Sequence, residues 1–167
     1  MKIEVNSATR VDLAGGTLDC WPLYSIVGDC KTINVSIDIQ TGVVLEAKEN
    51  LEIDINIRDL NYRKTFTDKK NLLESSDKEL DLLKAHIEFW MPTKGFYLET
   101  FSQSPIGGGL GGSSSLTISL LKAFGKMLGK SWSLNEIVTV ASNLEAKLLH
   151  TPTGTQDYFS PAQPGLN

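Results

Sequence analysis

The stretch SPIGGGLGGSSSLTISLLKAFGKMLG, residues 104–129, decides the fold more than any other part of this chain. Five of the six residues from Gly107 to Gly112 are glycine, three serines follow, and apolar residues then recur at helical spacing. Alone, such a segment is as typical of a flexible linker as of a binding loop. Here it joins the strand-like GFYLETF, residues 95–101, directly to an amphipathic helix. This context favours an anion-binding loop, because the free N–H groups of a first helical turn attract negative charge.

Two better-known phosphate-binding motifs do not explain this loop. A Walker loop requires Gly-Lys-Ser/Thr, and the loop contains no lysine. The spacing GxGxxG occurs at Gly107, Gly109 and Gly112. However, the flanking strands alternate as in an antiparallel sheet, and no acidic residue ends a clear strand about 20 residues further on.

Alternating apolar residues before the loop predict a sheet. We expect strands over residues 3–13, 31–46, 51–57 and 63–66, with a break at 14–16 and a hairpin at Thr41-Gly42. The charged residues 67–78 are expected to be exposed, and a helix is expected near 77–91, ended by Pro92. A further helix over about 134–149 begins at Ser133, and Glu136 completes a capping-box pattern. This order of elements suggests an α+β fold.

Composition limits the class of protein. The chain has 167 residues, 41% of them hydrophobic, and a net charge of -4, which is typical of one globular domain and not of a nucleic-acid binder. No apolar run is long enough for a membrane span. The opening residues lack a secretory signal, and Cys20 and Cys30 form no disulfide framework, so we expect a cytoplasmic chain with free thiols. We expect the aromatic residues Trp21 and Tyr24 in the core.

Two more segments carry polar residues at suggestive positions. TRVDLAGGTLD, residues 9–19, reads by itself as a strand ending in a tight turn, with Asp19 as a turn residue. NLEAKLLHTPTGTQDYF, residues 143–159, places Glu145 on a helix and Asp157 after it. Each of these acids alone is more typical of a solvated or turn position than of a catalytic one.

Together, the three segments resemble one enzyme superfamily, in its order. PIGGGLGGSSS resembles the Pro-x-Gly-x-Gly-Leu-Gly-Ser-Ser pattern of the galactokinase, homoserine kinase, mevalonate kinase and phosphomevalonate kinase superfamily. RVDLAGGTLD resembles the Arg-x-x-x-x-Gly-Gly-Gly-Thr-Asp pattern of its sugar-kinase branch, which contains the heptose-7-phosphate and fucose kinases, and GTQDYF is similar to that branch's Gly-Lys-Gln-Asp-aromatic ending. The chain departs from these patterns at Thr17, Leu18 and Gly112, where the family usually has Gly, Thr and Ser.

The resemblance implies a fold and a reaction. The fold is a lobe like domain 2 of ribosomal protein S5, with a mainly antiparallel sheet and helices packed on one face. Residues 1–167 would be the N-terminal, ATP-binding lobe, incomplete and without the C-terminal lobe, so activity of these residues alone is left open. The reaction is transfer of the γ-phosphate of ATP, with Mg²⁺, to a hydroxyl of a sugar or sugar phosphate.

The resemblance also assigns roles to residues of this chain. Asp157 would accept or polarise the proton of the attacking hydroxyl, and Arg10 would stand beside it and lower its pKa. Ser113 and Glu145 would hold Mg²⁺, and Asp19 with Gly16 and Thr17 would contact the sugar. The ATP phosphates would lie on Gly107, Gly108, Gly109, Leu110, Gly111, Gly112, Ser113 and Ser114.

Two alternatives from other functional classes stay open at this point. The chain would be a non-catalytic relic or regulatory lobe that binds nucleotide or sugar, or an S5-like interaction domain that uses the glycine loop for nucleic acid. The acidic composition and the absence of a basic cluster near the loop argue against the second. We expect no nucleic-acid or membrane partner, and apolar surface left by a missing lobe would favour a homo-oligomer.

Overall fold

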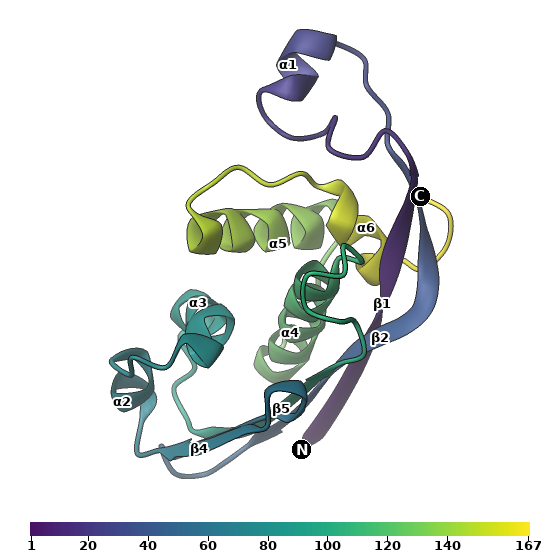
Figure 1. Cartoon of the computed structure of the whole chain (residues 1–167). Helices are drawn as coiled ribbons and strands as arrows, with labels where there is room; N and C mark the ends of the chain where they lie inside the picture. The colour runs from purple at the N-terminus through teal and green to yellow at the C-terminus, as the bar shows by residue number, and fades with distance from the viewer.

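A single sheet of five strands, in the order β1-β2-β5-β3-β4, forms one layer of the computed structural model, which describes all 167 residues (Figure 1). Neighbouring strands are antiparallel except β3 and β5, which run parallel. The predicted sheet is therefore confirmed as mainly antiparallel. The strands are β1 (Lys2–Ala14), β2 (Ile33–Ala47), β3 (Ile53–Ile57), β4 (Tyr62–Phe66) and β5 (Phe96–Ser102).

Helices form the second layer, and α3 to α6 lie together on one face of the sheet, as predicted (Figure 1). Helix α1 stands apart from the layers, beyond the end of β1 and β2. The helices are α1 (Leu23–Val27), α2 (Lys69–Leu73), α3 (Asp81–Trp90), α4 (Gly112–Leu128), α5 (Leu134–Leu149) and α6 (Gln156–Ala162), with short 3₁₀ turns at Arg58–Leu60 and Lys78–Leu80. No helix combines the length and the apolar character that crossing a membrane requires.

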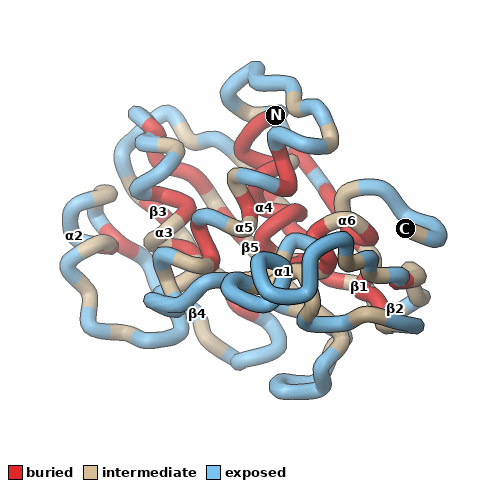
Figure 2. Tube along the Cα trace, turned by 90° about the horizontal axis from the view of Figure 1, so that it is seen from above, coloured by how far each residue is buried: buried red, intermediate tan, exposed pale blue.

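Buried and exposed side chains alternate along the first half of β1. Ile3, Val5 and Ser7 are buried under the helices, while the residues between them face solvent. The main core fills the space between the sheet and helices α3 and α4, and a second cluster joins α4, α5 and α6. Figure 2 shows the buried residues gathered in the strands and in α4, with α1 exposed. The most deeply buried helix is thus the one that follows the glycine loop.

The hairpin predicted at Thr41-Gly42 is wrong, because β2 continues through both residues as one strand. Gly42 lies opposite Phe101 of β5, and a Cβ atom there would stand 2.2 Å from the Phe101 ring. The glycine is needed for cross-strand packing and not for a turn. The irregularity in β2 lies earlier, where its register with β1 shifts between Ala8 and Thr9.

Two further expectations are corrected. The helix expected near 77–91 is a 3₁₀ turn followed by α3, and the charged segment before it contains α2, whose Leu72 is fully buried. Trp21 and Tyr24, expected in the core, are 60% and 46% exposed because α1 packs on no other element. By contrast, α5 has the predicted bounds, and the capping box between Ser133 and Glu136 is confirmed.

Candidate functional site

Two of the three sequence motifs line one pocket of about 440 Å³, and Arg10 of the third motif contacts the glycine loop that forms its wall. The glycine loop from Gly107 to Gly112 forms one wall, and Ser113, Ser114, Glu145 and Asp157 line the same space. Leu60, Leu82 and Leu83, from a 3₁₀ turn and helix α3, form an apolar wall. Charged groups and apolar surface therefore face each other across the glycine loop.

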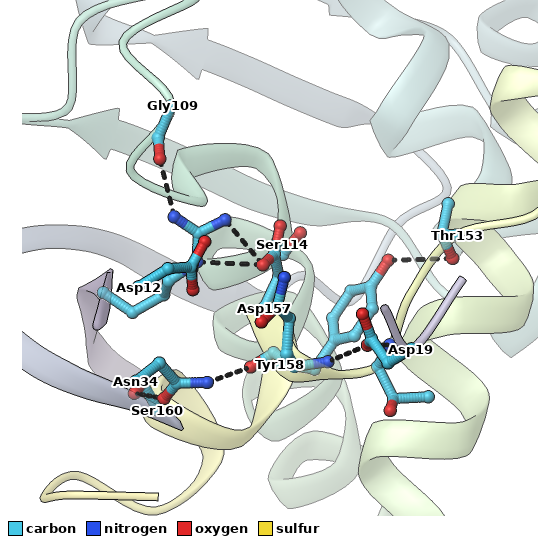
Figure 3. Close-up of polar contacts among 12 residues, drawn as sticks. Asp12, Asp19, Asn34, Gly109, Ser114, Thr153, Asp157, Tyr158 and Ser160 are labelled. Carbon is cyan, nitrogen blue, oxygen red and sulfur yellow. Dashed lines mark hydrogen bonds and ion pairs between the residues drawn. The ribbon is translucent and has the colours of Figure 1, made fainter. Parts of the chain in front are cut away.

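Arg10 and Asp157 form the central ion pair of this site (Figure 3). The Nε and Nη2 atoms of Arg10 donate to Oδ1 of Asp157 over 2.8 and 2.6 Å, and Nη1 donates to the carbonyl oxygen of Gly109 over 2.6 Å. Arg10 is only 7% exposed, and its backbone N–H donates to the Leu110 carbonyl. One arginine from β1 thus holds both the glycine loop and the first turn of α6, where Asp157 lies.

Burial, and not the arginine, decides the direction of the pKa shift of Asp157. Loss of water around the half-buried carboxyl raises its pKa above the ordinary 3.8, while the bonds from Arg10 oppose this. We expected Arg10 to lower this pKa, and its effect has that sign but is outweighed. A raised pKa makes Asp157 a better proton acceptor than a fully solvated aspartate.

Glu145 reaches the pocket from α5 and is only 8% exposed. Its Oε2 atom accepts hydrogen bonds from Ser114 Oγ over 3.0 Å and from the Tyr158 hydroxyl over 2.7 Å. Burial and the nearby Glu145 charge raise the pKa of Tyr158, which keeps that hydroxyl protonated as a donor. Ser113, predicted to share a magnesium ion with Glu145, is exposed and does not contact it, so Ser114 is the serine that the fold brings to this carboxylate.

The donor atoms at this position fit Mg²⁺. Mg²⁺ prefers hard oxygen ligands and is commonly held by one or two protein groups together with phosphate and water. Glu145 offers a carboxylate whose Oε1 atom makes no hydrogen bond, and the hydroxyl of Ser113 lines the same pocket. A role for these residues toward magnesium stays a prediction.

The glycine loop has the backbone geometry of an anion site. Gly107, Gly109 and Gly111 have φ angles of 73°, 68° and 69°, a left-handed conformation that glycine adopts without strain. The N–H groups of Gly109 and Gly111 make no hydrogen bond within the chain, and those of the first turn of α4 have no partner within that helix. At Gly112 a Cβ atom would lie 2.9 Å from Ser104, which explains why serine, usual in the family, is absent here.

The residues predicted to contact sugar lie in the turn after β1. Asp19 accepts hydrogen bonds through Oδ2 from the backbone N–H groups of Thr155 and Gln156, over 2.5 and 2.8 Å. It therefore lies on the α6 side of Asp157, outside the residues that line the main pocket. Thr17 has a φ of 76°, the left-handed conformation that explains why glycine is usual at this position.

Sequence reasoning missed two polar residues of this site. Asp12 Oδ1 lies 3.3 Å from Nε of Arg10, and Tyr158 donates to Glu145. Asp12 had a usable signal, since residues two apart on a strand share a face. Tyr158 matched the aromatic position of the family ending, but its contact with Glu145 depends on α6, a helix that was not predicted.

The chain matches one family model and several known proteins. A family model described as the GHMP kinases N terminal domain matches residues 76–162. The D-glycero-alpha-D-manno-heptose 7-phosphate kinase of Campylobacter jejuni is 29% identical over 170 residues, covering 99% of this chain and 49% of that protein. A mevalonate kinase of Methanocaldococcus jannaschii is 28% identical over 152 residues, covering 81% of this chain and 47% of that protein.

Solved structures show the same lobe. The crystal structure of a D-glycero-D-manno-heptose 1-phosphate kinase from Bacteroides thetaiotaomicron matches with a TM-score of 0.87 and 27% identity, over 100% of this chain and 55% of that one. The chain spans about half the length of the curated relatives it matches. The predicted S5-like α+β fold is confirmed. Because the family model matches more than half of its residues, this chain belongs to the GHMP kinases.

Proposed function

We propose that residues 1–167 are the N-terminal lobe of an ATP-dependent kinase that phosphorylates a hydroxyl of a sugar or sugar phosphate. The observation that carries this proposal is the meeting of Asp157, Arg10 and Glu145 at the glycine loop. Phosphoryl transfer needs positioned charges more than covalent chemistry, and these residue types supply them. The resemblance to heptose phosphate kinases supports the acceptor class.

The nucleotide fits the pocket in one direction. The triphosphate would lie on the free N–H groups of the glycine loop and of the first turn of α4, a 17-residue helix. The purine would then meet the apolar wall of Leu60 and Leu82. Glu145 and Ser113 would hold Mg²⁺, which neutralises phosphate charge when bound.

Asp157 and Arg10 perform the chemical step in this proposal. Asp157 accepts the proton of the acceptor hydroxyl as its oxygen bonds to the γ-phosphorus, and the bond from that phosphorus to the β,γ-bridging oxygen breaks to release ADP. General-base help of this kind contributes about 10²–10⁴-fold. Arg10 fixes the carboxylate by two hydrogen bonds to one oxygen, which leaves Oδ2 of Asp157 for the acceptor.

The proposal is tested with γ-labelled ATP, Mg²⁺ and a panel of heptoses, hexoses and their phosphates. We expect the labelled phosphate to appear in one class of acceptor. Asp157→Asn should abolish this transfer and leave nucleotide binding nearly unchanged. The control is Asp29→Asn, an exposed aspartate between β1 and β2 that lines no part of the pocket, which should leave transfer unchanged.

Binding of the acceptors is followed in parallel by ligand-observed NMR, so that the result does not depend on turnover alone. A folded chain that binds nucleotide but none of the sugars, with or without nucleotide, contradicts the proposed acceptor class. Equal transfer by Asp157→Asn and the unsubstituted chain removes Asp157 from the proton-accepting role.

A further inference from the structure

The turn after β1 and the first turn of α6 are joined by one side chain. Asp19 accepts from the N–H groups of Thr155 and Gln156, the two residues that come just before Asp157. These N–H groups stand at the start of α6, where a helix has no internal acceptor for them. A carboxylate from a segment 136 residues earlier in the sequence therefore caps this helix.

The packing around Asp19 is built for this contact. Gly154 lies so close that a Cβ atom there would stand 2.5 to 2.7 Å from the Asp19 carboxylate. On the opposite side of the first turn of α6, Nδ2 of Asn34 from β2 donates to the Gln156 carbonyl over 3.0 Å. Arg10 then binds the Asp157 side chain itself. The backbone before Asp157 and its carboxylate are thus fixed separately.

We propose that Asp19 is a positioning residue that sets the place of Asp157 through the first turn of α6. This inference rests on the proposed function for the identification of Asp157 as the proton acceptor. The geometric part of the inference does not depend on the proposed function, since it concerns contacts within the chain. It is distinct from the sugar contact predicted for Asp19, because Oδ2 is the atom that holds α6, while Oδ1 accepts no hydrogen bond within the chain.

A consequence follows for acceptor recognition. A hydroxyl that binds Oδ1 of Asp19 contacts the same carboxylate that fixes α6. The acceptor and the group that takes its proton would then both be oriented by hydrogen bonds to one side chain. Acceptors that lack a hydroxyl able to bind Asp19 would bind more weakly and would also be poorly oriented toward Asp157.

The test uses amide hydrogen exchange and NMR on the 167-residue chain. In Asp19→Ala we expect exchange at Thr155 and Gln156 to accelerate about tenfold, the size typical of a lost helix cap. In Asp19→Asn the amide oxygen can still accept both bonds, so exchange should stay within about twofold of the unsubstituted chain. Asp29→Ala, an exposed aspartate of the same segment, is the matched control.

A second readout separates positioning from mere stabilisation of the turn. The NMR signal of the Arg10 Nε–H group reports its hydrogen bond to Asp157. This signal should shift or broaden in Asp19→Ala and should keep its position and width in Asp19→Asn. Gly154→Ala perturbs the contact without changing Asp19 and should reproduce the Asp19→Ala result if that variant fails to fold.

Unchanged exchange at Thr155 and Gln156, or an unchanged Arg10 signal, in folded Asp19→Ala or Gly154→Ala overturns the inference. The failure of the proposed function would instead appear as absent nucleotide or sugar binding by a chain in which both NMR signatures are intact. The two failures are therefore distinguishable.

Discussion

At the scale of the residue, the site places an acid where its charge costs stability. Burial raises the pKa of Asp157 above 3.8, so the folded chain holds the proton more tightly than the unfolded chain does. The cost of ionising Asp157 is absent below the unfolded pKa and complete once the pH exceeds the raised folded pKa.

We therefore predict that the free energy of unfolding of Asp157→Asn, relative to the unsubstituted chain, increases as the pH rises from below 3.8 to neutrality through the raised pKa. The substitution also removes the carboxylate that pairs with the buried Arg10, so the change of this difference with pH, and not its value at one pH, reports the shift. Urea unfolding of both chains over this pH range measures the difference. A difference that stays constant, or that decreases as the pH rises, would contradict the assigned direction of the pKa shift.

Thr17 makes a second prediction at this scale. It is β-branched and has a φ of 76°, a conformation that costs about 1–2 kcal/mol in a non-glycine residue, less the entropy that glycine loses on folding. Thr17→Gly should therefore stabilise the chain by up to about 1 kcal/mol in urea unfolding. Asn61→Gly, at a φ of 50°, is the control and should change stability less, because asparagine tolerates this region. Equal effects of the two changes would argue against strain at Thr17.

Sequence reasoning predicted several residues that the fold brings together, but not every contact between them. Arg10 and Asp157 could be paired through the family resemblance, and the structure joins them. The serine that contacts Glu145 could not be fixed, since successive residues of a helix point about 100° apart and the phase of α4 depends on the glycine turn. The choice between Ser113 and Ser114 thus required the fold.

At the scale of the element, a capping box begins α5, the helix that carries Glu145. Ser133 accepts from the Glu136 N–H, and Glu136 accepts from the Ser133 N–H over 2.8 Å. We predict that Ser133→Ala lowers the free energy of unfolding by about 1 kcal/mol, the usual value of such a cap. Ser131→Ala, exposed and without a hydrogen bond, is the matched control for urea unfolding. A loss equal to that of the control would mean that the cap contributes nothing.

Local signals account for the elements that were predicted, and long-range contacts for those that were not. The capping box and the apolar spacing predicted the bounds of α5. The Thr-Gly pair wrongly predicted a turn, because Gly42 is needed to pack against Phe101 on a neighbouring strand. The parallel pairing of β3 with β5 joins segments 43 residues apart and leaves no local pattern. Helix α6 is short and depends on Asp19 and Asn34 for its first turn.

At the scale of the whole molecule, β1 organises the site. It contributes Arg10 to the glycine loop and to α6, and its following turn contributes Asp19. The loop itself lies between β5 and α4, whose buried face anchors it on the core. The glycine loop and the residues proposed as base and metal ligands are therefore held by the sheet and helices, an arrangement that suits the proposed phosphoryl transfer.

The central claim is that the glycine loop of this chain binds the phosphates of ATP. The most direct test is calorimetric titration of the chain with a Mg²⁺-bound, non-hydrolysable ATP analogue, repeated with Gly111→Ala and Gly129→Ala. Both glycines have left-handed φ angles, of 69° and 71°, but they stand at opposite ends of α4 and only Gly111 contacts Arg10 and the pocket.

We predict saturable binding by the unsubstituted chain and by Gly129→Ala, and binding at least about tenfold weaker in Gly111→Ala, because strain and a new Cβ atom deform the loop. Absence of saturable binding by the folded chain, or equal affinity of the two variants, would contradict the claim.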